Sequence, residues 1–172
     1  MTKSKKIFLL GFMGSGKSTI GKKLANQIHQ KFIDLDEEIE KHTQKSIAEL
    51  FENKGEAYFR KKEKEVLEKF CKDKENFIMA LGGGTPCFHN NMELINQSGV
   101  SIYINYNAGI LASRLFNAKT VRPLVQGKSE EEIKLFIEKT LLERELFYTQ
   151  SQFTIKKDNV KVEDVLKLTQ NF

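Results

Sequence analysis

A glycine-rich segment near the start of the chain constrains the fold more than any other feature of the sequence. Residues Gly11–Ser18, GFMGSGKS, fit the pattern G-x-x-x-x-G-K-[ST] at every position. The apolar run Lys6–Leu10 stands directly before this segment, and the amphipathic stretch Lys17–Ile28 follows it. This order predicts a buried strand, a tight loop and a helix, with the loop N–H groups and the helix N-terminus facing a phosphate.

The residue types within this loop suit a nucleoside triphosphate. Its glycines let the backbone curl around an anion. The Lys17 ammonium would meet the β- and γ-phosphates, and the Ser18 hydroxyl would bind Mg²⁺. The loop leaves the phosphate acceptor unidentified. We expect the nucleotide to be held by Gly14, Ser15, Gly16, Lys17, Ser18 and Thr19.

Short apolar runs alternate with longer amphipathic stretches along the chain. This alternation predicts an α/β fold in which helices cover both faces of a parallel sheet, with ligands bound beyond the carboxyl ends of the strands. The candidate strands are Lys6–Leu10, Lys31–Asp34, Phe77–Leu81, Val100–Ile104 and Phe153–Ile155. The candidate helices are Lys17–Ile28, Asp36–Lys41, Ser46–Phe70 with a break at Gly55, Asn91–Gln97, Asn107–Phe116, Glu130–Tyr148 and Val162–Gln170.

The composition is that of an ordinary soluble globular protein. With 172 residues, 40% of them hydrophobic and 30% charged, the chain suits one domain over residues 1–172. The net charge of +5 is spread along the chain without a basic stripe, which argues against nucleic-acid binding. No segment is apolar enough to cross a membrane, and Cys71 and Cys87 lack metal-ligand spacing. We therefore expect a cytoplasmic protein. We also expect a monomer, because no long exposed apolar segment is evident.

Two aspartates end the second candidate strand. Asp34 closes an apolar run, where an unpaired carboxylate would be unfavourable, and a bound metal ion would remove that difficulty. If the strand continues through both residues, Asp34 and Asp36 project to the same side. Asp36 could instead be the N-cap of the next helix, with Glu37 and Glu38 favouring the helix dipole. The sequence alone leaves both interpretations of Asp36 open.

Three further groups could belong to a binding site or be ordinary features of the surface. Arg60 and Glu63 are three residues apart on a predicted helix and can form an ion pair. The triple glycine Gly82–Gly84 follows a strand, which suggests either a ligand close to the backbone or a flexible turn. Arg144 and Tyr148 share one face of a late helix.

The stretch Phe116–Ser129 is polar and lies between two predicted helices. It contains Arg122 beside Pro123. We interpret this stretch as a mobile lid, of about residues 114–129, that excludes water during phosphate chemistry. A plain connection between helices is the alternative interpretation.

Seven short motifs, taken in chain order, resemble those of shikimate kinases. The match runs from Lys6 to about Tyr148 and is specific because of the order, since each motif except the phosphate loop is weak alone. The motifs are G-x-x-x-x-G-K-[ST], D-x-D (Asp34–Asp36), I-x-x-[IL]-F (Ile47–Phe51), G-E-x-x-F-R-x-x-E (Gly55–Glu63), L-G-G-G (Leu81–Gly84), R-P-L (Arg122–Leu124) and R-x-x-x-Y (Arg144–Tyr148).

The resemblance implies a fold and a reaction. The fold would be of the nucleoside-monophosphate-kinase type, a three-layer α/β/α arrangement around a parallel sheet of five strands in the order 2-3-1-4-5. The reaction would be phosphorylation of the shikimate 3-hydroxyl by ATP with Mg²⁺, in aromatic amino-acid biosynthesis. Shikimate would bind a helical region of about residues 35–63.

The family also implies roles for single residues that match its motifs. Lys17, Asp36 and Arg122 would be the catalytic groups: Asp36 would contact shikimate hydroxyls and accept a proton, while Arg122 would close over the phosphates. Asp34 and Ser18 would hold Mg²⁺, Asp34 mainly through water. Arg114 would lie beside the adenine, and Glu63 would orient Arg60. The other shikimate contacts would be Phe51, Phe59, Arg60, Gly82, Gly83, Gly84 and Arg144.

The match to the family is incomplete in three places. Val125 stands where the family usually has the second leucine of R-P-L-L. Residues Thr85–Cys87 after the triple glycine receive no assignment, and neither does the adenine-side segment Lys156–Asn159.

Two other classes of function remain open from the sequence. One is a different small-metabolite kinase of the same fold, such as a gluconate or nucleoside-monophosphate kinase. Paired arginines favour a compact carboxylate as acceptor, because a guanidinium pairs with a carboxylate through two parallel hydrogen bonds. The other is a nucleotide-binding regulator, which would need the phosphate loop but not Asp36, Arg60 and Arg144.

Overall fold

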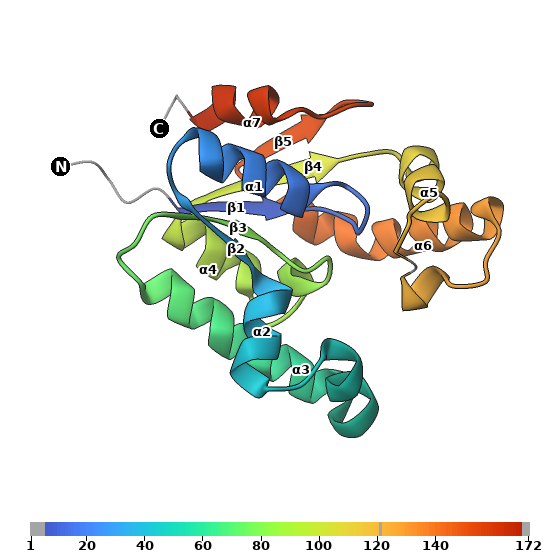
Figure 1. Cartoon of the computed structure of the whole chain (residues 1–172), viewed down its shortest axis with the longest axis horizontal. Helices are drawn as coiled ribbons and strands as arrows, with labels where there is room; N and C mark the ends of the chain where they lie inside the picture. Colours follow the sequence, from blue (N-terminus) through green and yellow to red (C-terminus); the bar gives the residue numbers. More distant parts are fainter. Residues whose placement is uncertain (1–5, 121, 170–172) are drawn as a thin grey trace.

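A parallel sheet of five strands forms the centre of the molecule (Figure 1), in a computed structural model that describes residues 6–120 and 122–169. The strand order is β2-β3-β1-β4-β5, as expected. In the middle of the sheet, Ile7 of β1 pairs with Ile78 of β3 on one side and with Val100 of β4 on the other. The strands are β1 (Lys6–Leu10), β2 (Lys31–Asp34), β3 (Phe77–Ala80), β4 (Val100–Asn105) and β5 (Phe153–Lys156).

Helices cover both faces of this sheet. In Figure 1, α1 and α7 lie on one side of the strands and α3 and α4 on the other. The α-helices are α1 (Lys17–Gln27), α2 (Leu35–Thr43), α3 (Ile47–Lys72), α4 (Asn91–Ser98), α5 (Ala108–Phe116), α6 (Glu130–Tyr148) and α7 (Val162–Thr169), and two short 3-10 helices are η1 (Thr85–Cys87) and η2 (Pro123–Val125).

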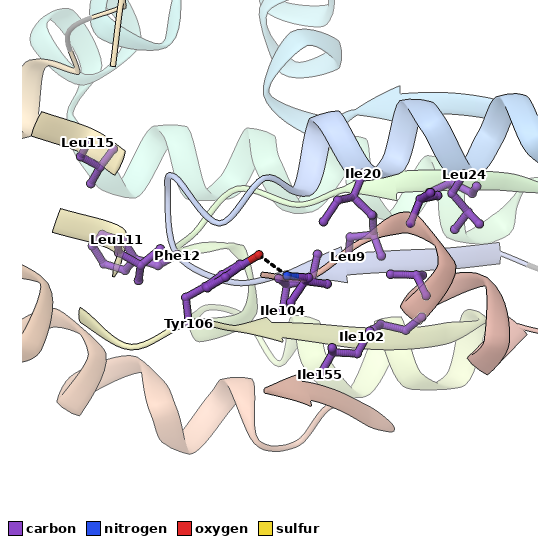
Figure 2. Packing of buried hydrophobic residues seen from close by; sticks show 14 of the residues in the cluster. Leu9, Phe12, Ile20, Leu24, Ile102, Ile104, Tyr106, Leu111, Leu115 and Ile155 are labelled. Atoms are coloured by element: carbon purple, nitrogen blue, oxygen red, sulfur yellow. Dashed lines mark hydrogen bonds between the residues drawn. The ribbon is translucent and has the colours of Figure 1, made fainter. Parts of the chain in front are cut away.

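The alternating side chains of β1 divide the core into two layers. All residues of β1 are buried, which is typical of a central strand in a parallel sheet. Ile7 and Leu9 belong to one layer, together with side chains of α1, α5, α6 and α7, and Figure 2 shows part of it. Phe8 and Leu10 belong to the other layer, with side chains of α2, α3 and α4. Successive strand residues point to opposite faces, so one strand contributes to both layers.

The long helix α3 is bent, as the position of Gly55 predicts. Gly55 has φ 78° and ψ 170°, which lies outside the helical region. Residues with a Cβ rarely adopt this backbone conformation. The helix begins with a capping box in which Ser46 and Glu49 each accept a hydrogen bond from the other's backbone N–H. A short first segment therefore precedes the bend, and the segment after it carries Arg60 and Glu63.

The predicted elements are all present, with boundaries that differ from the prediction by at most two residues. Helix α2 begins at Leu35, one residue earlier than predicted, and η1 and η2 were not predicted. Gln170, the predicted last residue of the final helix, lies outside the described residues. Within residues 6–120 and 122–169, none of the helices combines the length and the apolar character needed to span a membrane.

Candidate active site

A cavity of about 620 Å³ lies at the carboxyl ends of the strands. Its wall joins the glycine-rich loop to the D-x-D segment and to the segment that follows β3, so motifs far apart in sequence meet there. This is the location expected of a ligand site in a parallel α/β sheet. Among the residues that line it are Gly14, Gly16, Lys17, Ser18, Thr19, Asp34, Asp36, Gly82, Gly83, Arg114 and Arg122.

The glycine-rich loop has the backbone that its sequence predicts. Gly14 and Gly16 have φ 81° and 84°, in the left-handed region that favours glycine. Gly16 is also the N-cap of α1 and offers no side chain to the first N–H groups of that helix. Those N–H groups and the helix dipole favour an anion at this end of the cavity.

Lys17 places its ammonium group in the centre of the loop. Its Nζ donates hydrogen bonds to the carbonyl oxygens of Gly11 at 2.8 Å and Phe12 at 3.0 Å. Burial lowers the pKa of Lys17 to about 8, and the nearby carboxylates of Asp36 and Asp34 oppose that shift. A phosphate bound in the loop would therefore lie next to the Lys17 ammonium, which the backbone carbonyl groups of the loop hold in place.

Asp34, and not Asp36, is the N-cap of α2. Its Oδ1 accepts a hydrogen bond from the Asp36 N–H at 3.1 Å, and β2 ends at Asp34. The interpretation of Asp36 as an N-cap is therefore wrong, and so is the idea that the strand continues through both aspartates. The chain turns into a helix at Leu35 because Asp34 satisfies one of the first free N–H groups.

The second oxygen of Asp34 connects this cap to the phosphate loop. Oδ2 accepts a hydrogen bond from the Ser18 hydroxyl at 2.8 Å. A hydroxyl beside a carboxylate at the phosphate site is a donor set that fits Mg²⁺, which prefers oxygen ligands and retains several waters. No group of three or more His, Cys, Asp or Glu side chains with the geometry of a metal site occurs among the described residues, so this set would depend on phosphate oxygens and water.

Asp36 is half-buried in the cavity wall, in the first turn of α2. A Cβ added to Gly82 would lie 3.0 Å from Asp36 Oδ1, so the triple glycine and this carboxylate are in close contact. Burial raises the pKa of Asp36 to about 6, with further contributions from the negative charges of Asp34 and Glu63. A carboxyl with such a pKa can accept a proton near neutral pH.

Arg60 is held on several sides by charged and aromatic groups. Its Nη1 donates to both oxygens of Glu63, at 3.1 and 2.9 Å, while Nε and Nη2 reach one oxygen of the half-exposed Glu56 at 3.3 Å. The guanidinium carbon lies 4.1 Å from the ring centroid of Phe88 and 5.0 Å from that of Phe59. Arg60 is 8% exposed and Glu63 is fully buried, which makes this ion pair part of the interior and not a surface salt bridge.

The triple glycine brings Arg60 and Arg144 to adjacent positions from two different helices. A Cβ added to Gly84 would lie 2.3 Å from Arg60 Nη2, and one added to Gly83 would lie 2.9 Å from Arg144 Nη1. Any side chain at either position would displace a guanidinium. Glycine at 83 and 84 therefore fits the close approach of the two arginines, which favours a binding segment over a merely flexible turn.

Tyr148 fixes the backbone of this segment. Its hydroxyl donates a hydrogen bond to the Gly83 carbonyl oxygen at 2.5 Å. Burial raises the pKa of Tyr148 to about 12, so the phenol keeps its proton and remains a donor. The R-x-x-x-Y motif thus supplies the guanidinium of Arg144 and an anchor for the glycine that this guanidinium contacts.

Two phenylalanines of the family motifs pack together near Arg60. The ring centroids of Phe51 and Phe59 are 4.7 Å apart; Phe59 is buried, and Phe51 is 39% exposed. Arg60, Arg144, Phe51 and Phe59 do not line the 620 Å³ cavity themselves. They adjoin it through the triple glycine, of which Gly82 and Gly83 line the wall.

Arg114 marks a second cavity, of about 510 Å³, on the other side of the glycine-rich loop. Its guanidinium carbon lies 4.1 Å from the ring centroid of Tyr106, whose hydroxyl accepts a hydrogen bond from the Val160 N–H at 2.7 Å (Figure 2). Tyr106 and the segment from Asn159 to Glu163 line this cavity. Tyr106 was not predicted, whereas the segment begins in the adenine-side stretch Lys156–Asn159, whose residues the sequence left unassigned. The available signal was a buried aromatic residue with a polar group directly after β4.

Between Phe116 and Ser129, the predicted lid supplies two charged side chains, Lys119 and Arg122, to the main cavity. Arg122 is exposed and lines the cavity, while Val125 of η2 is buried in the core layer with Leu9. Val125 thus packs as the leucine of the family pattern would be expected to pack. Val121 lies outside the described residues.

Comparison of the sequence with known proteins identifies its relatives. The shikimate kinase family model matches residues 13–171. A shikimate kinase from Azobacteroides pseudotrichonymphae genomovar. CFP2 is 46% identical over 155 residues, which are 89% of this chain and 91% of that protein. A shikimate kinase from Flavobacterium johnsoniae is 42% identical over 163 residues, 94% of this chain and 95% of that protein.

Solved structures of similar fold agree with the sequence comparison. The shikimate kinase from Bacteroides thetaiotaomicron matches with a TM-score of 0.90 and 39% identity, covering 97% of both chains. The shikimate kinase from Acinetobacter baumannii, solved in complex with shikimate, matches with a TM-score of 0.84 and 31% identity over 97% of this chain and 92% of that one. On its sequence, its fold and the geometry of its motifs, the chain belongs to the shikimate kinase family.

Proposed function

We propose that this protein transfers the γ-phosphoryl group of ATP to the 3-hydroxyl of shikimate, giving shikimate 3-phosphate and ADP. The observation that carries the proposal is the placement of Asp36 between the phosphate-loop lysine and the segment that holds two arginines. Membership of the shikimate kinase family and the shikimate complex of the Acinetobacter baumannii relative support it. They do not favour a gluconate kinase, a nucleoside-monophosphate kinase or a regulator.

The glycine-rich loop would bind the phosphates of ATP, and Arg114 would lie against the base. Lys17 and the N–H groups at the start of α1 would face the β- and γ-phosphates. Mg²⁺, held by Ser18 and by Asp34 with water, would neutralise charge on the phosphates.

Arg60 and Arg144 would bind the carboxylate of shikimate. Both guanidinium groups contact the triple glycine, so a small planar anion lying against that segment would meet them together. Phe51 and Phe59 would pack against the carbocycle. Glu63 would keep the Arg60 guanidinium in place, because its buried carboxylate accepts two hydrogen bonds from Nη1.

Asp36 would position the attacking hydroxyl and accept its proton. The oxygen of that hydroxyl forms a bond to the γ-phosphorus while the bond to the bridging oxygen of ADP breaks, and the proton passes to Asp36. Lys17 would remain beside the transferred group, and Arg122 of the lid would add a second cation. Positioning and charge neutralisation are most of what phosphoryl transfer requires.

A comparison of acceptors in one assay tests the function. ADP release is measured with ATP, Mg²⁺ and, in turn, shikimate, gluconate and nucleoside monophosphates, and the product is identified by NMR. We expect turnover with shikimate alone and phosphate on its 3-hydroxyl. Faster turnover with another acceptor, or slow ADP release that no acceptor stimulates, would contradict the proposal.

We further propose that the chain acts as a single kinase domain, as a monomer and in the cytoplasm. The free thiols of Cys71 and Cys87 support a reducing compartment. Within that domain, residues 35–63 would form the shikimate-binding region and residues 114–129 the lid. Leu135, Leu142 and Leu146 are exposed on α6, and an exposed apolar surface can pack against a second copy of the chain. The mass of the protein in solution, measured by light scattering, therefore tests whether it is a monomer.

A further inference from the structure

Thr85, the first residue of η1, has a buried hydroxyl with a direct connection to the proposed substrate site. The residue is fully buried, and its Oγ1 donates a hydrogen bond to Glu63 Oε1 at 2.6 Å. Glu63 is also fully buried and ion-paired with Arg60. A buried carboxylate requires donors for both oxygens, and Thr85 supplies one of them from a different element of the fold.

The hydroxyl of Thr85 restricts the rotation of the Glu63 carboxylate. Arg60 Nη1 donates a hydrogen bond to each oxygen of Glu63. With these bonds alone, the Glu63 carboxylate could rotate together with the guanidinium. Thr85 adds a donor that belongs to the segment after β3 and not to α3. Glu63 is therefore tied to the same segment of chain as Gly84, against which Arg60 Nη2 packs.

Thr85 is itself fixed by two hydrogen bonds of its backbone. Its N–H donates to the Gly82 carbonyl oxygen at 3.1 Å, and its carbonyl oxygen accepts from the side chain of the fully buried Asn91 at 2.9 Å. A continuous chain of hydrogen bonds thus runs from Asn91 through Thr85 and Glu63 to Arg60. Such a chain has little freedom, because each member is buried and hydrogen-bonded to the next.

We infer that Thr85 is a positioning residue for substrate recognition: its hydroxyl orients Glu63 and, through Glu63, the guanidinium that Arg60 presents to the substrate carboxylate. The inference rests on the proposed function, since it assumes that Arg60 binds the carboxylate of shikimate. Thr85 would not touch the substrate or ATP. Its effect would therefore fall on shikimate binding and leave nucleotide binding alone.

Replacement of Thr85 by valine and by serine separates the hydroxyl from the shape of the side chain. Thr85→Val keeps the shape and removes the donor, and we expect KM for shikimate to rise about tenfold. KM for ATP should stay within about twofold, and kcat should fall less than kcat/KM. Thr85→Ser keeps the donor and should restore shikimate KM to near the wild-type value.

A matched control removes a buried threonine hydroxyl far from these groups. Thr169 is also buried, and its hydroxyl donates to the Leu166 carbonyl oxygen at 2.8 Å within α7. Thr169→Val should leave KM for shikimate unchanged, which measures the effect of a Thr→Val change by itself. Melting temperatures of all variants show which of them are folded, and Thr85→Ala replaces Thr85→Val if the latter does not fold.

The same change in a Glu63→Gln background tests whether Thr85 acts through Glu63. In that background, Thr85→Val should raise shikimate KM much less than tenfold, because the carboxylate it positions is absent. An unchanged shikimate KM in Thr85→Val, an equal rise in both backgrounds, or failure of Thr85→Ser to recover would overturn the inference. Wild-type protein without shikimate kinase activity would instead overturn the proposed function.

Discussion

At the scale of single residues, Asp36 connects the proposed catalysis with stability. Its pKa of about 6 exceeds the ordinary value of 3.8, because burial and the charges of Asp34 and Glu63 disfavour the ionised form. Between those two pH values the folded protein holds a proton that the unfolded chain has released. Stability therefore falls as pH rises through this window, and the ionised Asp36 remains destabilising at pH 7.

Replacement of Asp36 by asparagine should have opposite effects on turnover and stability. Turnover should fall at least about a hundredfold, since the hydroxyl loses its proton acceptor. Unfolding free energy at pH 7 should rise by about 1–2 kcal/mol, because a buried charge is removed, and this gain should vanish near pH 4. Urea unfolding at both pH values and steady-state kinetics are the measurements. Asp73→Asn, at an exposed aspartate that follows α3, is the control and should change neither quantity.

A wild-type turnover number in folded Asp36→Asn would remove Asp36 from the mechanism. In the wild-type protein, kcat should fall as pH drops through about 6, because the proton acceptor becomes protonated. A flat profile from pH 8 to 5 would contradict that role as well.

Removal of the Lys17 ammonium should abolish most phosphoryl transfer. In Lys17→Ala the transferred group loses its nearest fixed cation, and we expect kcat to fall about a hundredfold or more. The fold should survive for two reasons. Burial lowers the pKa of Lys17, so its buried cation does not stabilise the folded state, and the glycines determine the conformation of the loop backbone. Lys22→Ala, at an exposed lysine on the same helix, is the control. Full activity in a folded Lys17→Ala protein would contradict the assignment of the loop.

Conservative changes of the two arginines should weaken shikimate binding selectively. Arg60→Lys and Arg144→Lys keep the charge but lose the planar pair of donors, which is worth about 1.5–3 kcal/mol, or roughly ten- to a hundredfold in affinity. Calorimetric titration with shikimate and separately with ATP measures this. Loss of ATP affinity with normal shikimate affinity would place the acceptor site elsewhere.

At the scale of elements, the sequence predicts where chemistry lies better than how the chain turns there. The D-x-D motif identifies both aspartates, yet it does not tell which of them caps α2, since Asp34 and Asp36 are both good capping residues. The outcome depends on where β2 ends, and the pairing of Asp34 with Ala80 of β3 decides that. The bend at Gly55 was easier to predict, because a glycine inside a helical pattern weakens the helix at that point.

Two parts of the candidate site could not be predicted, because they depend on contacts between distant segments. Thr85 contacts Glu63 only after η1 forms beside α3, and Tyr106 meets Val160 only after β5 is placed next to β4. Neither pair has a fixed spacing in sequence. By contrast, Arg60 and Glu63 lie three residues apart on one helix, and their ion pair follows from that spacing.

The segment from Phe116 to Ser129 should behave as a lid. Arg122 lines the cavity and Leu124, two residues further, is 61% exposed, whereas Val125 is buried in the core. We therefore expect Arg122 and Leu124 to move over the site while Val125 stays packed. We expect trypsin to cleave after Lys119 and Lys128 in the free protein, and much more slowly when ADP and shikimate are both present. Equal cleavage rates in both conditions would indicate a plain connection.

Arg122 should contribute to the rate more than to binding. Arg122→Ala should lower kcat about a hundredfold with a smaller change in shikimate affinity, because the guanidinium would meet the phosphoryl group only in the proposed closed complex. Lys128→Ala removes an exposed cation from the same segment and is the matched control. Equal losses in both variants would indicate a general effect of charge.

At the scale of the whole molecule, the fold follows from the order of its elements. Strands that alternate with helices predict a parallel sheet, and the near-continuous apolar run of β1 predicts its central position. The exact strand order was expected from the family resemblance and is confirmed. This order brings the ends of β1, β2 and β3 together, so that Lys17, Asp34 and Gly82 line one cavity.

A crystal structure with ADP, Mg²⁺ and shikimate bound would show directly how the two substrates lie in the cavity. We expect the shikimate carboxylate within hydrogen-bond distance of Arg60 and Arg144, and its 3-hydroxyl within hydrogen-bond distance of Asp36 and directed at the phosphate loop. Shikimate bound away from the triple glycine, or reversed so that the carboxylate faces Lys17, would rule out the proposed site.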